Sequence, residues 1–297
     1  MSETISVIVV TWNDRENLLR CLASLEAQDW PRERVQLIVV DDGSTDGTAE
    51  AVRQAHPDAL LVVKKNSGAD NSRNHGLDRA SGEIIALIDA DCTAPPHWLD
   101  SLAAGLDEFD TPVIGGRILH PDGFWARMIG ISDFGEFQGT RPKAVSNIPT
   151  CNLGARKTLF DRFRFDETAR IGGDVLFACR LRQAGIGLCY DPRIVVRHHP
   201  RAHRKAFFDR ARRYGAGFVQ VRQQASGMKH GWLVRAGLPG VVVATLARTL
   251  LDWGRLLRHG HPAGVRWYEY PAAVVALPLK RLVSLGAAIR ASRHGEG

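Results

Sequence analysis

The chain has 297 residues, of which 44% are hydrophobic and 24% are charged, close to the averages for folded soluble proteins. This composition argues against an intrinsically disordered chain, and the length allows two domains or one large α/β domain. Five cysteines form an odd set without C-x-x-C spacing, so neither a disulfide framework nor a zinc site is indicated.

The net charge of +7 is unevenly distributed along the chain. From Tyr190 onward, 19 Lys and Arg stand against 5 Asp and Glu, a net charge of +14, whereas residues 1–189 carry −7. This asymmetry indicates a polyanionic partner for the basic part (a membrane surface, a nucleic acid or an anionic substrate) unless the basic residues form a solvated face. The apolar run at 5–10 is too short for a signal peptide, so we expect a cytoplasmic protein with reduced thiols.

Short apolar, β-branched segments alternate with helical patterns over the first 90 residues. Strands are expected at 5–10, 35–40, 59–63 and 83–88, and helices at 14–27, 45–55 and 70–80. This order predicts a mainly parallel sheet flanked by helices, with right-handed crossovers. Three of the strands end in polar residues: Thr11 and Asn13, Asp41 and Asp42, and Asp89 and Asp91. Because ligands bind outside the carboxyl ends of such strands, we expect one binding edge.

The rest of the chain divides into three parts. Residues 110–149 are irregular and rich in Gly, Pro and aromatic residues, and part of them is expected to be a mobile loop. From 151 to 199 the pattern is ordered again. A helix is expected at 174–184, and strand-like segments are expected at 187–190 and 194–196. From 201 onward the sequence is helical and basic.

Asp89-Ala90-Asp91 directly follows an apolar strand. Two carboxylates around one small residue can hold Mg²⁺ or Mn²⁺, and the cation in turn binds a diphosphate. Alone, such a motif is more often a solvated turn, but its position at a strand end favours the metal. In the second motif, residues 41–48, the carboxylate of Asp42 can accept from a nucleobase N–H, while Thr45 and Asp46 suit the cap of the next helix.

Three stretches, ISVIVVTWN, VVDDGSTDGT and NSGADNSRNHGLDRASGEIIALIDADC, resemble the family 2 glycosyltransferases, inverting enzymes of the GT-A fold. The resemblance is dense over residues 4–105 and returns at 147–199. It implies a mixed, mainly parallel sheet with a Rossmann-like nucleotide-binding half, a nucleoside-diphosphate sugar donor and a hydroxyl acceptor on a glycan or a lipid-linked molecule. It also implies a site: Thr11, Asn13 and Asp42 around the nucleoside, Asn66, Gly68, Arg73 and Asn74 beside the base and diphosphate, Asp89 near the ribose or metal, and Asp91 as metal ligand.

The family also carries an acidic pair just before a helix, and the second acid is the general base. Asp174 matches the second acid, but Gly173 stands where the first is expected. A carboxylate at Asp174 would remove the proton of the attacking hydroxyl. As an alternative, Asp174 only caps the helix that it opens. His198 matches a late histidine of the family and would complete the metal site, unless it belongs to a surface pair with His199.

Two further features have open interpretations. Trp98 is either a platform on which the acceptor sugar stacks or a core residue. In the basic last third of the chain, from residue 201 onward, the apolar segments 236–247 and 271–279 are both shorter than the ~20 residues that a spanning helix needs. Arg248, Asp252 and Arg255 form a polar stripe beside leucines. This pattern is typical of a helix lying on anionic lipids, and the alternative is a helical subdomain packed on the catalytic core.

We therefore predict a catalytic domain at 1–200, with a nucleotide-sugar part at 1–105 and an acceptor part at 106–200, followed by a basic helical region at 201–297. The predicted enzyme uses Mn²⁺ or Mg²⁺ and is peripheral at the inner face of the cell membrane. A sugar-phosphate nucleotidyltransferase is less consistent, because no glycine-rich basic loop follows the first strand. A non-enzymatic polyanion-binding protein and an inactive relative are further alternatives. No nucleic acid is expected, because the basic residues form no recognisable recognition module.

Overall fold

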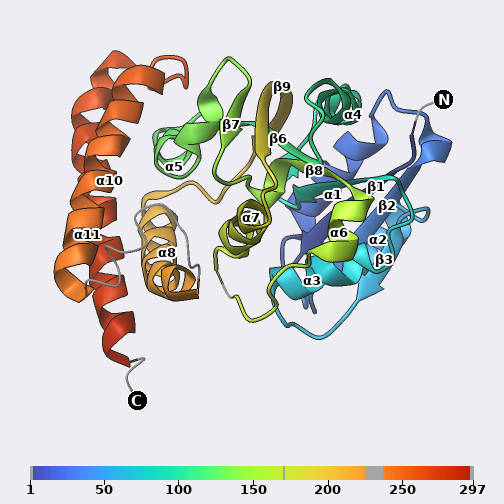
Figure 1. Cartoon of the computed structure of the whole chain (residues 1–297), viewed down its shortest axis with the longest axis horizontal. Coiled ribbons are helices and arrows are strands. Elements are labelled where there is room, and N and C mark those ends of the chain that lie inside the picture. The colour runs from blue at the N-terminus through green and yellow to red at the C-terminus, as the bar shows by residue number, and fades with distance from the viewer. Residues whose placement is uncertain (1–2, 170, 225–236, 295–297) are drawn as a thin grey trace. The chain divides into compact units, whose positions relative to one another are not determined.

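The computed structural model describes residues 3–169, 171–224 and 237–294 (Figure 1). Two compact units can be distinguished. Unit 1 comprises Met1–Ile118 and Gly139–His198, and unit 2 comprises Leu119–Gln138 and His199–Gly297. The segment Leu119–Gln138 thus belongs to unit 2, although the sequence analysis assigned it to the catalytic domain.

Unit 1 is built on a mixed sheet with the strand order β3-β2-β1-β4-β8-β6-β9-β5, and β7 pairs with β9. β1, β2, β3 and β4 run parallel, whereas β8 is antiparallel to β4 and to β6. The parallel half contains the strands predicted at the start of the chain, within one residue at each end. The strands are β1 (Ile5–Thr11), β2 (Val35–Asp41), β3 (Leu60–Val63), β4 (Ile84–Asp89), β5 (Cys92–Thr93), β6 (Val113–Leu119), β7 (Lys143–Val145), β8 (Leu153–Arg156) and β9 (Leu188–His198).

The helices of unit 1 are α1 (Arg15–Glu26), α2 (Thr48–Ala55), α3 (Ala69–Leu77), α4 (Trp98–Glu108), α6 (Lys157–Arg162) and α7 (Gly173–Gln183), with short 3₁₀ turns η1 (Arg32–Arg34) and η3 (Thr150–Asn152). Four of them, α1, α2, α3 and α7, follow the predicted order with ends that differ by at most three residues, whereas α4 was not predicted. α3 packs on β1 and β2, and α4 packs on β8 and β9. The two predicted segments at 187–190 and 194–196 are one strand, β9. Pro192 interrupts the strand-like pattern between them because it has no N–H to donate.

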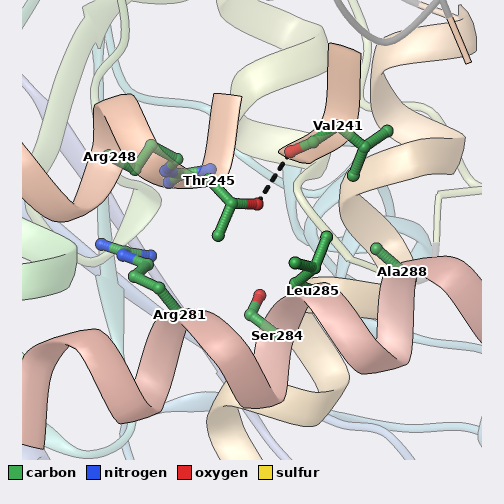
Figure 2. Close-up of a pocket in the computed structure, with 7 residues that line it drawn as sticks. All are labelled: Val241, Thr245, Arg248, Arg281, Ser284, Leu285 and Ala288. Atoms are coloured by element: carbon green, nitrogen blue, oxygen red, sulfur yellow. Dashed lines mark hydrogen bonds between the residues drawn. The ribbon is translucent and has the colours of Figure 1, made fainter. Parts of the chain in front are cut away.

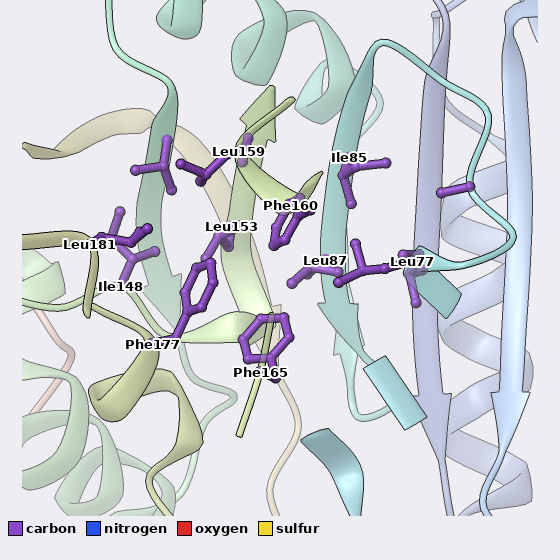
Figure 3. Close-up of a cluster of buried hydrophobic side chains, with 14 of the residues drawn as sticks. Leu77, Ile85, Leu87, Ile148, Leu153, Leu159, Phe160, Phe165, Phe177 and Leu181 are labelled. Carbon is purple, nitrogen blue, oxygen red and sulfur yellow. The ribbon is translucent and has the colours of Figure 1, made fainter. Parts of the chain in front are cut away.

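A buried apolar cluster joins α7 to the sheet (Figure 3). Ile85 and Leu87 of β4 belong to the same cluster as Phe160 of α6, Phe165 of the following loop and Phe177 of α7. The rings of Phe165 and Phe177 are stacked with centroids 4.5 Å apart, and those of Phe160 and Phe177 lie 5.7 Å apart. Stacked and offset rings of this kind add to the free energy of burying them. The cluster therefore fixes the start of α7 relative to β4.

Most of the segment expected to be irregular has regular secondary structure, so the prediction of an irregular segment is wrong for most of it. It contains β6, β7, the helix α5 (Phe124–Phe134) and the 3₁₀ turn η2 (Gly135–Gln138). Every residue from Ala126 to Ser132 in α5 is buried. A helix that is buried all round shows no 3.6-residue alternation of polar and apolar residues, which explains why its sequence pattern was not recognised.

Unit 2 is helical in the part that the structure describes, as predicted for the basic third. Besides α5 and η2 it contains α8 (Arg204–Gln224), α10 (Gly237–His259), η4 (Trp267–Glu269) and α11 (Tyr270–His294), and α11 packs on α8 and α10. Among the described residues, one helical stretch, Trp267–Ala291, is long and apolar enough to cross a membrane. Its most apolar part has a mean hydropathy of 1.7, and 39% of that part is buried inside the structure. The sequence analysis did not recognise it because Lys280 and Arg281 interrupt the apolar run.

Some charged side chains of unit 2 are buried, and some of its large apolar side chains are exposed. Asp252 is fully buried and accepts two hydrogen bonds from Arg281, at 2.7 and 3.0 Å. Lys280 is buried too, donates to Ser132 Oγ at 2.6 Å and forms an ion pair with Asp133 of α5. Asp252 therefore does not belong to a polar stripe facing solvent, and that prediction is wrong at this position. Exposed apolar side chains of α10 and α11 include Val243, Leu246, Leu250, Leu251, Leu257, Val274, Val275, Leu279 and Leu282.

Candidate active site

The carboxyl ends of the central strands bring the predicted polar residues to one edge of the sheet. In the parallel register, Thr11 at the end of β1 is the partner of Asp41 at the end of β2. Val10 is the partner of Asp89 at the end of β4. The prediction that these three strands deliver polar residues to one edge of the sheet is therefore confirmed.

The loops after β1 and β2 are held together by Asn13. Its backbone has a positive φ of 50°, a conformation that Asn tolerates better than most residues. Its N–H donates to Ser44 Oγ at 2.8 Å, and its side-chain Oδ1 accepts from the Thr45 N–H at 2.8 Å.

In the described part of the chain, the buried atoms Thr11 Oγ1 and Asp41 Oδ2 have no hydrogen-bond partner. A buried polar atom without a partner is costly, which marks the ends of β1 and β2 as a place where stability is not the only constraint.

The carboxylate of Asp42 shapes the loop before α3. The N–H of Ser67 donates to Oδ1 and the N–H of Gly68 to Oδ2, both at 2.9 Å. Lys64 forms an ion pair with the same side chain, of which only 4% is exposed. Asn66 in this loop is exposed. Asp42 thus positions the backbone around Asn66 and Gly68, and its own oxygens are already engaged.

Arg73 of α3 lies between two carboxylates. Nη1 donates to Asp70 Oδ1 at 2.7 Å, and Nη2 donates to Asp89 Oδ1 at 3.1 Å. The guanidinium also lies over the ring of Phe165, with its central carbon 5.8 Å from the centroid. Only 12% of the side chain is exposed, whereas 37% of the Asp89 side chain is exposed. The guanidinium therefore has a fixed position at the edge of the sheet, and Asp89 is the more accessible partner.

Asn74, the neighbour of Arg73, is bonded to the loop that precedes α7. Its Nδ2 donates to the carbonyl of Phe165 at 3.0 Å and to Glu167 Oε1 at 2.8 Å, and its Oδ1 accepts from the Phe165 N–H at 3.0 Å. The side chain is buried. Asn74 therefore ties α3 to the loop before α7, and both ends of its amide are hydrogen-bonded to that loop.

Asp91 and His198 form a pair of candidate metal ligands. His198 ends β9 opposite Cys92 of β5, and its Nε2 lies 3.2 Å from Asp91 Oδ2. Neighbouring ligands of one divalent cation, each bound at about 2.1 Å, lie about 3 Å apart, so this pair fits Mn²⁺ or Mg²⁺. The description of His198 as a mere surface residue is wrong, because only 5% of its side chain is exposed.

The third predicted ligand is not assembled with these two. Within the ranges that the structure describes, no group of three or more His, Cys, Asp or Glu side chains is arranged to hold a metal ion. Oδ1 of Asp89 accepts from Arg73 instead. A cation at Asp91 and His198 would therefore take its other ligands from phosphates and water, as Mg²⁺ usually does.

Asp174 lies in the first turn of α7, one residue beyond its start. The N-cap position is occupied by Gly172 with a φ of 76° and without a side-chain capping bond, so the alternative that Asp174 is the N-cap is wrong. Its Oδ1 accepts from the Val175 N–H at 2.9 Å. Burial raises the pKa of Asp174 to about 6, helped by the negative charges of Asp70 and Asp89 and opposed by Arg73 and the Val175 N–H. A carboxylate with this pKa is suited to accept a proton near neutral pH.

Trp98 is a core residue. It is fully buried at the start of α4, and its indole Nε1 donates to Asn152 Oδ1 at 2.9 Å. The alternative of an acceptor platform is therefore wrong.

Three polar residues of this region were not recognised from the sequence. They are Asp70 beside Arg73, Lys64 beside Asp42, and Glu167, which accepts from Asn71 and Asn74. Asp70 could have been found from its spacing, because residues three apart on a helix face each other and Asp70 and Arg73 are such a pair. No local pattern identifies Lys64 or Glu167, because their partners come from other elements.

Unit 2 contains a small cavity between α10 and α11 (Figure 2). Its volume is about 20 Å³, and it is lined by Val241, Thr245, Arg248, Arg281, Ser284, Leu285 and Ala288. The Thr245 hydroxyl donates to the Val241 carbonyl at 2.8 Å within it. Such a volume holds about one water molecule, so this cavity is too small for a nucleotide or a sugar.

Comparison with known proteins finds glycosyltransferases. The model of glycosyl transferase family 2 matches residues 6–164. The glycosyltransferase AglE of Haloferax volcanii is 29% identical over 225 residues, which are 73% of this chain and 73% of that protein. The succinoglycan biosynthesis protein ExoO of Rhizobium meliloti is 32% identical over 206 residues, which are 61% of this chain and 56% of that protein. The chain thus matches little more than half of the length of ExoO.

Two solved structures are similar over nearly the whole chain. The mannosyltransferase PcManGT of Pyrobaculum calidifontis, in complex with GDP-Man and Mn²⁺, has a TM-score of 0.65 and 19% identity, covering 98% of this chain and 87% of that one. TarS 1–349 of Staphylococcus aureus has a TM-score of 0.55 and 20% identity, covering 98% and 92%. At these identities the likeness concerns the fold, and the predicted GT-A-type α/β fold is confirmed.

Proposed function

Because this chain belongs to glycosyl transferase family 2 and is a glycosyltransferase, we propose that it moves a sugar from a nucleoside-diphosphate sugar to a hydroxyl acceptor with inversion. The arrangement that supports this most directly is Asp174, with a pKa of about 6, near Arg73 at the carboxyl edge of the sheet. A base and a fixed cation at one edge suit the two ends of a single displacement.

The donor nucleoside is proposed to bind at the ends of β1 and β2. The unsatisfied Thr11 Oγ1 and Asp41 Oδ2 offer hydrogen-bond partners there. Asn13 and Asp42 would act by holding the loops that surround the nucleoside, since both are already bonded to loop backbone. Asn66 and Gly68 belong to the loop that Asp42 shapes, and are proposed to lie beside the base and diphosphate.

The leaving diphosphate is proposed to face Arg73 and the acidic end of β4. A divalent cation, Mn²⁺ or Mg²⁺, held by Asp91 and His198 would neutralise negative charge on the diphosphate when bound. Asp89 would hold the ribose or approach the same cation, because its side chain is partly exposed at this edge. Arg73 adds a charge that does not need to reorient, since Asp70 and Asp89 hold both of its terminal nitrogens.

Asp174 is proposed to be the general base. Above about pH 6 its carboxylate is ionised and can take the proton of the acceptor hydroxyl as the oxygen attacks the anomeric carbon. Since one base serves one displacement, the configuration of the anomeric carbon inverts. The acceptor would be a hydroxyl of a polysaccharide, a glycolipid or a lipid-linked sugar.

The test is a donor screen that measures release of nucleoside diphosphate, starting with GDP-Man because PcManGT is in complex with it. We expect release with at least one donor, stimulation by Mn²⁺ or Mg²⁺, and a loss of about 10²-fold or more in Asp91→Ala and Asp174→Asn. Asp58→Asn is the matched control, because the Asp58 side chain is 84% exposed. A wild-type rate in either site variant would refute the role of that residue. Pyrophosphate release from a nucleoside triphosphate and a sugar phosphate would instead indicate nucleotidyl transfer.

A second proposal concerns the partner of unit 2. Exposed apolar side chains such as Leu250 and Leu257, with 64% and 78% of their surface accessible, lie on α10, whereas Asp252 of the same helix is fully buried. Arg258 of α10 is exposed as well. Apolar and cationic side chains on one helical surface suit a membrane that contains anionic lipids. We propose that this surface makes a peripheral contact with the inner face of the membrane, where a lipid-linked acceptor would be available.

This contact can be tested by co-sedimentation with vesicles of neutral or anionic lipids. Wild-type protein is expected to bind anionic vesicles, and the double variant Leu250→Glu/Leu257→Glu is expected to lose binding without loss of thermal stability. Leu60→Glu, which changes an exposed leucine of unit 1, is the matched control. Equal binding by wild-type protein and the double variant would refute the proposed surface.

A further inference from the structure

Position 173 lacks a side chain because a carboxylate from another helix fills the space. A Cβ built on Gly173 would lie 1.4 Å from Oδ2 and 2.4 Å from Cγ of Asp70. Gly173 is the first residue of α7, and Asp70 is the second residue of α3. No other amino acid fits at position 173 while Asp70 keeps its place, because atoms in protein interiors are already in van der Waals contact. A carboxylate therefore lies next to Asp174 even though position 173 carries none.

Asp70 is in an environment that a purely structural residue would seldom occupy. Only 6% of its side chain is exposed, and it forms an ion pair with Arg73. Removing a carboxylate from water is costly, and apolar residues of similar size often serve stability as well as a buried ion pair. Its negative charge also raises the pKa of Asp174, although burial is the larger cause. The charge at this position thus acts on two groups of the proposed site.

Two carboxylates on one guanidinium define its orientation better than one. Asp70 accepts from Nη1 of Arg73, and Asp89 accepts from Nη2. The two acids come from α3 and β4, so the guanidinium is held between a helix and a strand end. Without Asp70, Arg73 would keep one carboxylate partner, Asp89, beside its contact with the Phe165 ring, and its orientation would be less well defined.

We propose that Asp70 is a positioning residue of the transfer reaction, which holds Arg73 against Asp89 and supplies beside Asp174 the carboxylate for which Gly173 leaves room. This inference rests on the proposed function, in which Asp174 is the base and Arg73 faces the diphosphate. It predicts that the carboxylate can be moved from α3 to α7, provided that its original position is vacated.

The experiment compares four variants with the wild type: Asp70→Ala, Gly173→Asp, the double variant with both changes, and the control Gly187→Asp. A Cβ at Gly187 meets nothing within 4 Å, so the control adds the same acid in open space. Nucleoside diphosphate release is measured with the donor found in the screen. We expect kcat to fall about 10²-fold in Asp70→Ala and in Gly173→Asp, with the donor KM changed less than about threefold. The kcat of the double variant should recover to within about tenfold of the wild-type value. The kcat of Gly187→Asp should equal the wild-type value.

The same variants are unfolded with urea, which requires no activity. Gly173→Asp should lower the unfolding midpoint in the wild type but not in Asp70→Ala, because the two carboxylates compete for one space. A wild-type kcat in Asp70→Ala, or a double variant no better than the poorer single variant, would overturn the proposal. A wild type that releases no nucleoside diphosphate would refute the proposed function alone. If Gly173→Asp then changes the unfolding midpoint equally in the wild type and in Asp70→Ala, the placement of Asp70 against position 173 would be overturned.

Discussion

Replacing Asp174 by Asn should abolish turnover and stabilise the folded protein. Asn keeps an oxygen that can accept the Val175 N–H, so the local structure of α7 should persist. It has no charge to be buried and cannot take a proton. If Asp174 is the general base, kcat should fall by about 10²- to 10⁴-fold.

The gain in stability follows from the pKa of Asp174. Burial raises this pKa to about 6, from an ordinary value of about 3.9 for Asp. The folded state thus binds the proton more tightly than the unfolded state, and ionisation at higher pH costs the folded state free energy. Each tenfold change in proton affinity corresponds to about 1.4 kcal/mol, so the cost reaches about 3 kcal/mol above pH 7. It declines to about 1 kcal/mol at pH 4.5 and vanishes below the unfolded-state pKa.

The assay is urea unfolding of wild-type protein and Asp174→Asn at pH 7.5 and pH 4.5. The free energy of unfolding of the variant should exceed that of the wild type by up to about 3 kcal/mol at pH 7.5 and by about 1 kcal/mol at pH 4.5. In parallel, the wild-type kcat/KM should fall about tenfold for each pH unit below 6, because the base becomes protonated. A stability difference that does not change with pH, or that favours the wild type at pH 7.5, would refute this reasoning.

Three further substitutions test the packing inside each of the two units. Phe177→Ala should lower the free energy of unfolding by about 3–5 kcal/mol in urea titrations, because it leaves a cavity in the aromatic cluster. Asp252→Asn should cost about 3–5 kcal/mol in the same measurement, since the buried Arg281 guanidinium loses its counter-charge. Trp98→Phe should cost about 1–3 kcal/mol, because Asn152 Oδ1 loses its donor, and kinetics should show an unchanged acceptor KM. A large rise in the acceptor KM would indicate that Trp98 contacts the acceptor after all.

Much of the parallel half of unit 1 could be predicted because its signals are local. β1, β2 and β4 are continuous apolar runs buried on both faces, and such runs are typical of parallel strands. Since these strands are parallel neighbours, the polar residues that follow them had to meet at one edge. Asp42 and Asp89 were found in this way without any knowledge of tertiary contacts.

Other features had no local signal. α5 is buried all round, so its sequence lacks the polar face by which helices are recognised. On α10, the polar residue Asp252 was expected to face solvent. It faces Arg281 of α11 instead, because a buried acid is stable only with a partner that lies on another element.

Residue patterns were enough to predict the order of the first four strands, the edge to which Thr11, Asp42, Asp89 and Asp91 belong, and the family resemblance that the comparisons bear out. These properties depend on the spacing of apolar residues within single elements and on residues next to strand ends. Only the tertiary structure decided which groups meet there. The carboxylate of Asp70 comes to lie against Gly173 because α3 and the start of α7 are both packed on the sheet. A contact of this kind between distant residues depends on the shapes of both helices, and no spacing rule within either one encodes it.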